Sequence, residues 1–106
     1  MKELPKSTKV VVIGGGVAGT SCAYHLAKFG WKDVILLERD QLTSGTTWHA
    51  AGLLGQLGAS STITKIRKYS LDLYKELEKT TGLSTGMKQN GAITVASTKE
   101  RMQELL

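Results

Sequence analysis

Three glycines near the start of the chain have the spacing of a turn that binds a nucleotide's pyrophosphate. Gly14, Gly16 and Gly19 directly follow the β-branched run Val10–Ile13, and a helical pattern begins after them. Such a turn uses the first glycine to bend, the second to admit a pyrophosphate close to the backbone, and the third to pack the helix on the strand. Free N–H groups and the positive end of the helix dipole would bind the anion. The spacing therefore predicts a nucleotide site.

A carboxylate follows at the distance that such a site requires. Glu38 ends a second apolar run, Asp33–Glu38. In dinucleotide-binding folds an acid at this position accepts both ribose hydroxyls of an adenosine. A solvated strand end is the alternative role for Glu38. The order of strand, glycines, helix and acid favours the nucleotide.

Hydroxyl side chains and a histidine come next. Residues 43–47 read Thr-Ser-Gly-Thr-Thr. They combine capping residues with glycine, so we expect them to present hydroxyls and N–H groups at the start of a helix. They follow Glu38 closely and are placed to contact the same ligand further along its length. From the pattern alone, His49 is a surface or core histidine, and Trp48 is a packing residue.

These residues need a parallel α/β scaffold to hold them together. Val10–Ile13 is apolar throughout, which is typical of a central parallel strand buried on both faces. The helix that follows places Cys22 among its sheet-facing residues and ends at Gly30, a good residue after a helix C-terminus. The alternation of strand and helix predicts the N-terminal part of a Rossmann-type domain.

The pattern changes in the last quarter of the chain. An amphipathic helix runs from Ile63 to Gly82. Residues 86–97 then contain the turn signal Asn90-Gly91 followed by a strand, which predicts the start of an antiparallel β subdomain. Ser97 and Glu100 have the spacing of a capping box that opens a final helix. We expect a leader over residues 1–8, a nucleotide-binding segment over 9–82, and the start of a substrate subdomain over 83–106.

Length and composition limit the class of protein. The chain has 106 residues, of which 41% are hydrophobic, as in an ordinary globular domain. Only two strands of a doubly wound sheet are recognisable, so we expect an incomplete domain, the N-terminal part of a longer protein. The net charge of +5 is scattered along the chain, which argues against nucleic-acid binding. Cys22 is the only cysteine, so neither a disulfide nor a cysteine-based metal site is expected.

The sequence also bears on where the protein acts. No run of residues is long and apolar enough to span a membrane, and residues 1–9 are too short and polar for a signal peptide. We expect no membrane association. The bacterial cytoplasm is the simplest location, and the mitochondrial matrix is the alternative if Met1 replaces a transit peptide.

The chain as a whole resembles the N-terminus of the sarcosine and dimethylglycine dehydrogenases, within the D-amino-acid-oxidase-like flavoproteins. The stretches that carry the resemblance are VVIGGGVAG at 11–19, LLER at 36–39, LTSGTTWHAAGLL at 42–54 and QNGA at 89–92. Many flavoproteins share the glycine motif, whereas the Trp-His-Ala-Ala-Gly segment at 48–52 is much narrower. Residues 42–49 and 89–91 are closer to the sarcosine dehydrogenase branch.

The resemblance implies FAD as the cofactor. Its pyrophosphate would lie over Gly14–Gly19 and its ribose on Glu38. In family members the histidine that matches His49 is bonded covalently to the 8α carbon of the flavin, and a neutral imidazole is a suitable nucleophile. The further flavin contacts implied are Arg39, Thr46, Thr47, Gly52 and Leu53. For Arg39, Thr46 and Thr47 a capping or surface role is the alternative.

The resemblance also implies oxidative N-demethylation of an N-methylglycine, with hydride transfer to the flavin and electron-transfer flavoprotein as the electron acceptor. Tetrahydrofolate and the substrate would bind beyond Leu106, so we expect no catalytic residue within this chain and no activity from it alone. Three alternatives stay open: an amine or amino-acid oxidase with dissociable FAD, an NAD-dependent dehydrogenase, and a regulatory relative without catalysis.

Overall fold

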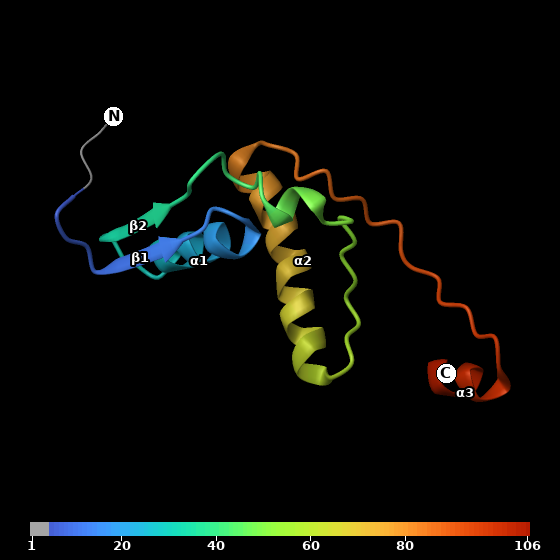
Figure 1. Cartoon of the computed structure of the whole chain (residues 1–106). Coiled ribbons are helices and arrows are strands. Elements are labelled where there is room, and N and C mark those ends of the chain that lie inside the picture. The colour runs from blue at the N-terminus through green and yellow to red at the C-terminus, as the bar shows by residue number, and fades with distance from the viewer. Residues whose placement is uncertain (1–4) are drawn as a thin grey trace. The chain divides into compact units, whose positions relative to one another are not determined.

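The computed structural model describes residues 5–106, which form two compact units, one through Gly52 and one from Leu53 to Leu106. The elements and their bounds are β1 (Val10–Ile13), α1 (Val17–Lys28), β2 (Val34–Leu37), the 3₁₀ helix η1 (Thr46–His49), α2 (Ser61–Thr81) and α3 (Lys99–Leu105) (Figure 1). The first unit contains β1, α1, β2 and η1, and the second contains α2 and α3.

The first unit is a strand–helix–strand arrangement. β1 and β2 are parallel, with Val10 opposite Val34 and Ile13 opposite Leu37. α1 packs against one face of this two-stranded sheet (Figure 1). Gly30 follows α1 with φ +88°, as predicted for the residue after the helix. The predicted start of a Rossmann-type fold is therefore present, with both strands ending at the same edge.

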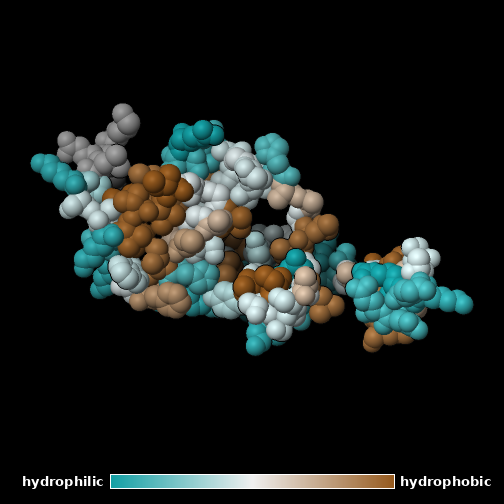
Figure 2. All heavy atoms as spheres, turned by 60° about the horizontal axis from the view of Figure 1, so that its bottom comes forward, coloured by the Kyte–Doolittle hydropathy of each residue, from teal (hydrophilic) through white to brown (hydrophobic). Residues whose placement is uncertain are grey.

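β1 is half-covered rather than buried on both faces, which corrects the sequence prediction. Successive strand residues point to opposite faces, and α1 covers only the face that carries Val12. On the other face Val11 is 48% and Ile13 85% exposed, and the first unit shows a hydrophobic patch (Figure 2). Cys22 is exposed, not buried, because a two-stranded sheet covers less of α1 than the wider sheet that the pattern implies.

The segment before β1 is attached to β2. Residues 1–4 of the expected leader lie outside the described residues. The Thr8 hydroxyl donates to Asp33 Oδ1 at 2.9 Å, and the Lys9 N–H donates to Asp33 Oδ2 at 3.2 Å. The end of the leader is thereby fixed at the residue before β2.

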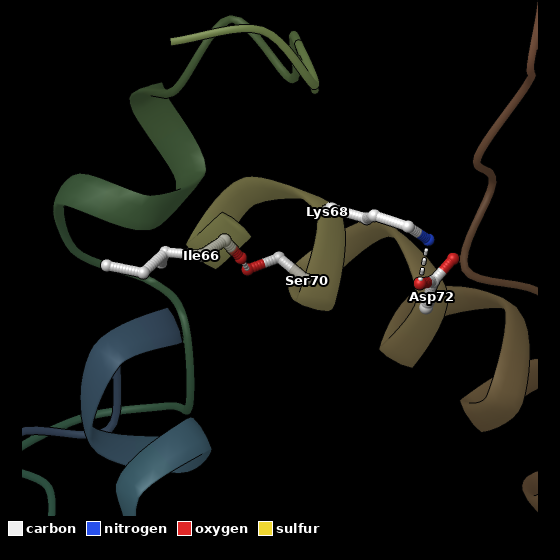
Figure 3. Close-up of polar contacts among 4 residues, drawn as sticks. All are labelled: Ile66, Lys68, Ser70 and Asp72. Atoms are coloured by element: carbon white, nitrogen blue, oxygen red, sulfur yellow. Dashed lines mark hydrogen bonds and ion pairs between the residues drawn. The ribbon is translucent and has the colours of Figure 1, made fainter. Parts of the chain in front are cut away.

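α2 ends at the predicted Gly82 but begins at Ser61, two residues before the predicted start at Ile63, because Ser60 caps it. Ser60 Oγ accepts a hydrogen bond from the Ile63 N–H, and Gly82 closes the helix with φ +69°. On its surface the Lys68 ammonium pairs with the Asp72 carboxylate at 2.6 Å (Figure 3). Both side chains are more than half exposed, so water screens this pair and it adds little to stability.

The segment between α2 and α3 contradicts the predicted antiparallel strand. No strand is assigned in residues 83–98, and Ile93 is 94% and Val95 82% exposed. Gly91 adopts the positive φ of +77° that the turn signal predicts. Among the described residues, however, no second strand pairs with the backbone N–H and C=O groups that follow it. Thr98, not Ser97, caps α3 by accepting from the Arg101 N–H, so the predicted capping box of Ser97 and Glu100 is wrong and a simple hydroxyl N-cap takes its place.

The described helices were predicted not to span a membrane. Within residues 5–106, no helix combines the length and the apolar character that crossing a bilayer requires.

Candidate functional site

A groove of about 420 Å³ opens where β1 and β2 end, at the carboxyl edge where ligands bind in parallel α/β folds. It brings together six of the residues predicted from the sequence. Its lining consists of Ile13, Gly14, Gly16, Leu37, Glu38, Arg39, Asp40, Ser44, Gly45, Thr46 and Thr47. Its size is within the range of small-molecule sites.

The glycine turn has the geometry that the spacing predicts. Gly14 has φ +103°, which only glycine adopts without strain. A Cβ on Gly19 would lie 1.8 Å from the Gly14 carbonyl oxygen, so this close approach of α1 to the turn requires glycine. Gly15 also lacks space, since its Cβ would lie 2.6 Å from Leu42 Cδ2. Gly15 was not among the residues predicted for the turn, although the three consecutive glycines at 14–16 were a signal for it.

Glu38 holds the glycine turn through its carboxylate. Oε2 accepts the Gly15 N–H at 2.6 Å, while Oε1 accepts the N–H groups of Arg39 at 2.7 Å and Asp40 at 3.1 Å. The Gly15 hydrogen bond, followed by that of Asp40, lowers the pKa of Glu38 below its ordinary value. A carboxylate has about four acceptor positions. Three of them are occupied by backbone N–H groups, which leaves one for a further donor.

The lowered pKa of Glu38 gives a pH test. We expect Glu38→Gln to lower the thermal midpoint of the natural protein that carries this sequence at pH 7, because an amide cannot accept three backbone N–H groups. A depressed folded pKa means that the stabilisation is complete above the ordinary value of 4.5 and is lost as the pH falls below it. Thermal midpoints of both proteins between pH 3 and 7 should therefore converge at the acid end. A difference that does not change with pH would exclude the carboxylate as its cause.

Thr47 caps α1 from a distant part of the chain. The N-cap residue Gly16 has no side chain, and the Val17 N–H donates instead to Thr47 Oγ1 at 2.9 Å. A Cβ on Gly16 would lie 3.0 Å from the same oxygen. A hydroxyl that accepts one hydrogen bond still has its own proton to donate. Thr47 can therefore hold the helix terminus and donate to an anion in the groove.

A strained residue attaches the same segment to the glycine turn. The Thr43 N–H donates to the Gly15 carbonyl oxygen at 2.9 Å, and Thr43 has φ +68°, which is uncommon outside glycine. Residues 43–47 are thus joined to the turn by Thr43 and to α1 by Thr47. The hydroxyl cluster reaches the same ligand space as Glu38, as its position in the sequence predicts.

His49 ends η1 and is exposed, outside the lining of the groove. Its Nδ1 lies 3.0 Å from the Gly45 carbonyl oxygen. A carbonyl only accepts, so Nδ1 carries the proton, and in the neutral ring Nε2 keeps a lone pair. Of the remaining predicted residues, Gly52 has φ +70° and ends the first unit, while Leu53 is 88% exposed and begins the second.

The groove is lined by the glycine turn at the start of α1 and by a carboxylate. The first N–H groups of a helix have no partner inside it, and the N-terminus of α1 opens into the groove beside Gly16, where a Cβ would reduce the space. The Glu38 carboxylate, which accepts the Gly15 N–H at 2.6 Å, lines the same groove. Among the residues that the structure describes, no three His, Cys, Asp or Glu side chains form a metal cluster.

Comparison with known proteins gives matches over nearly the whole chain. Residues 9–106 match the family described as FAD dependent oxidoreductase. The 4-methylaminobutanoate oxidase (formaldehyde-forming) of Paenarthrobacter nicotinovorans is 47% identical over 103 residues, which is 97% of this chain and 12% of that protein. Human mitochondrial sarcosine dehydrogenase is 48% identical over 104 residues, 97% of this chain and 11% of the relative.

A relative of another kind is equally similar. The mouse mitochondrial pyruvate dehydrogenase phosphatase regulatory subunit is 45% identical over 102 residues, 96% of this chain and 12% of that protein. The chain thus spans about an eighth of the length of the curated relatives that it matches.

Proposed function

The chain belongs to the family of FAD-dependent oxidoreductases, and from this premise we propose that its groove binds FAD in a protein that oxidatively demethylates a small N-methylated amine. The sarcosine and dimethylglycine dehydrogenases supply the substrate class, by resemblance. The observation that carries the FAD site is the groove in which the open N-terminus of α1, the Thr47 hydroxyl and the Glu38 carboxylate face one ligand space.

Gly16, Thr47 and Glu38 would each contact a different part of FAD. The glycine turn and α1 would bind the pyrophosphate, with Gly16 leaving space for it and Thr47 donating its hydroxyl proton to a phosphate oxygen. Glu38 would accept one ribose hydroxyl at its remaining acceptor position. Arg39 and Thr46 line the same groove and would add polar contacts.

His49 would hold the flavin covalently. Support comes from its position two residues after Thr47 and from the Nδ1 hydrogen bond to Gly45, which leaves Nε2 as the nitrogen with a free electron pair. We extend the proposal to Gly52 and Leu53 as flavin contacts on the resemblance alone.

FAD, when bound, supplies the acceptor for the hydride of an N-methyl group. This chain's own residues bind and orient it, and none of them is assigned a catalytic step. Electron-transfer flavoprotein as the acceptor of electrons, and tetrahydrofolate as the acceptor of the one-carbon unit, follow from the resemblance. The compartment, bacterial cytoplasm or mitochondrial matrix, stays a proposal too, since relatives of both origins match equally well.

A second candidate is a regulatory protein that keeps the nucleotide fold as a scaffold. The 45% identity to a phosphatase regulatory subunit supports it as directly as the other identities support an enzyme. The two candidates differ in whether bound flavin can be reduced by an amine.

The test is an anaerobic titration of the purified natural protein. We expect sarcosine, dimethylglycine or 4-methylaminobutanoate to bleach the visible flavin absorbance and to yield formaldehyde. Bleaching by a D-amino acid instead would favour an amino-acid oxidase. Bound flavin that no amine reduces would favour the scaffold, and a protein with no flavin would contradict the FAD site itself.

A further inference from the structure

η1 is a short rigid connection between the groove and His49. It spans Thr46–His49, and inside it the Trp48 N–H donates to the Gly45 carbonyl at 3.1 Å. The His49 imidazole is held against that same carbonyl. A 3₁₀ helix rises about 2.0 Å per residue, so Thr47 and His49 are separated by about 4 Å along its axis. Thr47 and His49 are thus held in one short helix by hydrogen bonds that converge on the Gly45 carbonyl.

Thr47 is also the residue through which η1 is joined to α1. Its Oγ1 accepts the Val17 N–H at 2.9 Å, across 30 residues of sequence. The partner is a backbone group in the first turn of α1, beside the predicted pyrophosphate position at Gly16. The hydrogen bond thus fixes η1 relative to the part of the groove that would hold the cofactor's phosphates.

We propose that Thr47 is a positioning residue for flavin attachment, which sets His49 Nε2 at the bonding distance through its hydrogen bond to Val17. The inference rests on the proposed covalent linkage. In that step His49 forms a C–N bond with its Nε2 lone pair. The 8α carbon would lose a proton to water, and the imidazole would lose its Nδ1 proton to water once Nε2 is bonded. The electron pair of the broken C–H bond would stay on the flavin until dioxygen, or another two-electron acceptor, takes it up.

The experiment measures the rate of attachment separately from binding. The natural protein, prepared without flavin, is incubated with FAD at concentrations that saturate the rate, and flavin fluorescence of the denatured band is followed in time. We expect Thr47→Val, which removes the hydroxyl at nearly constant volume, to slow attachment about tenfold or more, because a misplacement of about 1 Å can cost about a hundredfold in rate. Thr47→Ser, which keeps the hydroxyl, should restore most of the rate.

A matched control is Thr20→Val. The Thr20 hydroxyl donates to the carbonyls of Gly16 and Val17 within the same end of α1, and the residue does not line the groove. We expect this variant to attach flavin at close to the wild-type rate. Equal slowing in Thr20→Val would show a general weakening of α1 and overturn the proposal.

The remaining outcomes are also decisive. A wild-type rate in Thr47→Val, or its recovery once FAD is saturating, would show that Thr47 acts in binding only and would overturn the inference. Failure of Thr47→Ser to restore the rate would exclude the hydrogen bond as the cause. If the wild-type protein itself attaches no flavin, the covalent linkage of the proposed function is wrong, which is a different result from any of these.

Discussion

Gly19→Ala is expected to prevent the glycine turn from closing and to cost about 3 kcal/mol of stability, the upper end of the usual range for overpacking. The added Cβ would lie 1.8 Å from the Gly14 carbonyl oxygen, which is a backbone atom and cannot rotate away. α1 would have to move from β1, and with it the N–H groups at its first turn. The natural protein carrying this change should therefore show both a lower thermal midpoint and little bound flavin.

Gly55→Ala is the control for that experiment. A Cβ at Gly55 meets no atom within 4 Å, and the residue does not have a positive φ. We expect its thermal midpoint and flavin content to stay at wild-type values. If Gly19→Ala behaves like Gly55→Ala, the close packing of α1 on the turn is not a requirement of the fold.

His49→Ala has the second large expected effect, the complete loss of covalently held flavin. The contacts of the groove at Gly16, Glu38 and Thr47 do not involve the imidazole, so FAD should still bind reversibly. On a denaturing gel the wild-type band should fluoresce and the mutant band should not, while both proteins are yellow before denaturation. His25→Ala is the matched control, because His25 is the only other histidine and does not line the groove. A fluorescent His49→Ala band would contradict the assignment.

The fold follows from the sequence where the determining signal is local. The turn at Gly14, the end of α1 at Gly30 and the end of α2 at Gly82 depend on backbone conformations that a few neighbouring residues specify. The prediction of a strand within residues 86–97 was wrong because a strand forms only with a hydrogen-bonding partner strand, and the sequence alone does not locate that partner. The exposure of Val11 and Ile13 could not be predicted for a similar reason, because the burial of a strand depends on elements that are distant in the chain.

The candidate site, like the fold, could be predicted from the sequence only where the signal is local. Gly14, Gly16 and Glu38 could be placed from their spacing, because the motif is compact and its geometry is fixed by the strand and the helix. The hydrogen bond between Thr47 and Val17 could not, since it joins residues 30 positions apart. The three hydrogen bonds from backbone N–H groups to the Glu38 carboxylate could not be predicted either, because they depend on the conformation of the glycine turn.

The attachment of flavin to this chain can be located directly by peptide mapping. Trypsin cleavage after Arg39 and Lys65 yields the peptide 40–65, which contains His49 as its only histidine and neither cysteine nor tyrosine. The account predicts that this peptide from the natural protein carries the flavin absorbance and the added mass of FAD. Recovery of this peptide without flavin from a protein that was yellow when purified would contradict the covalent site at His49.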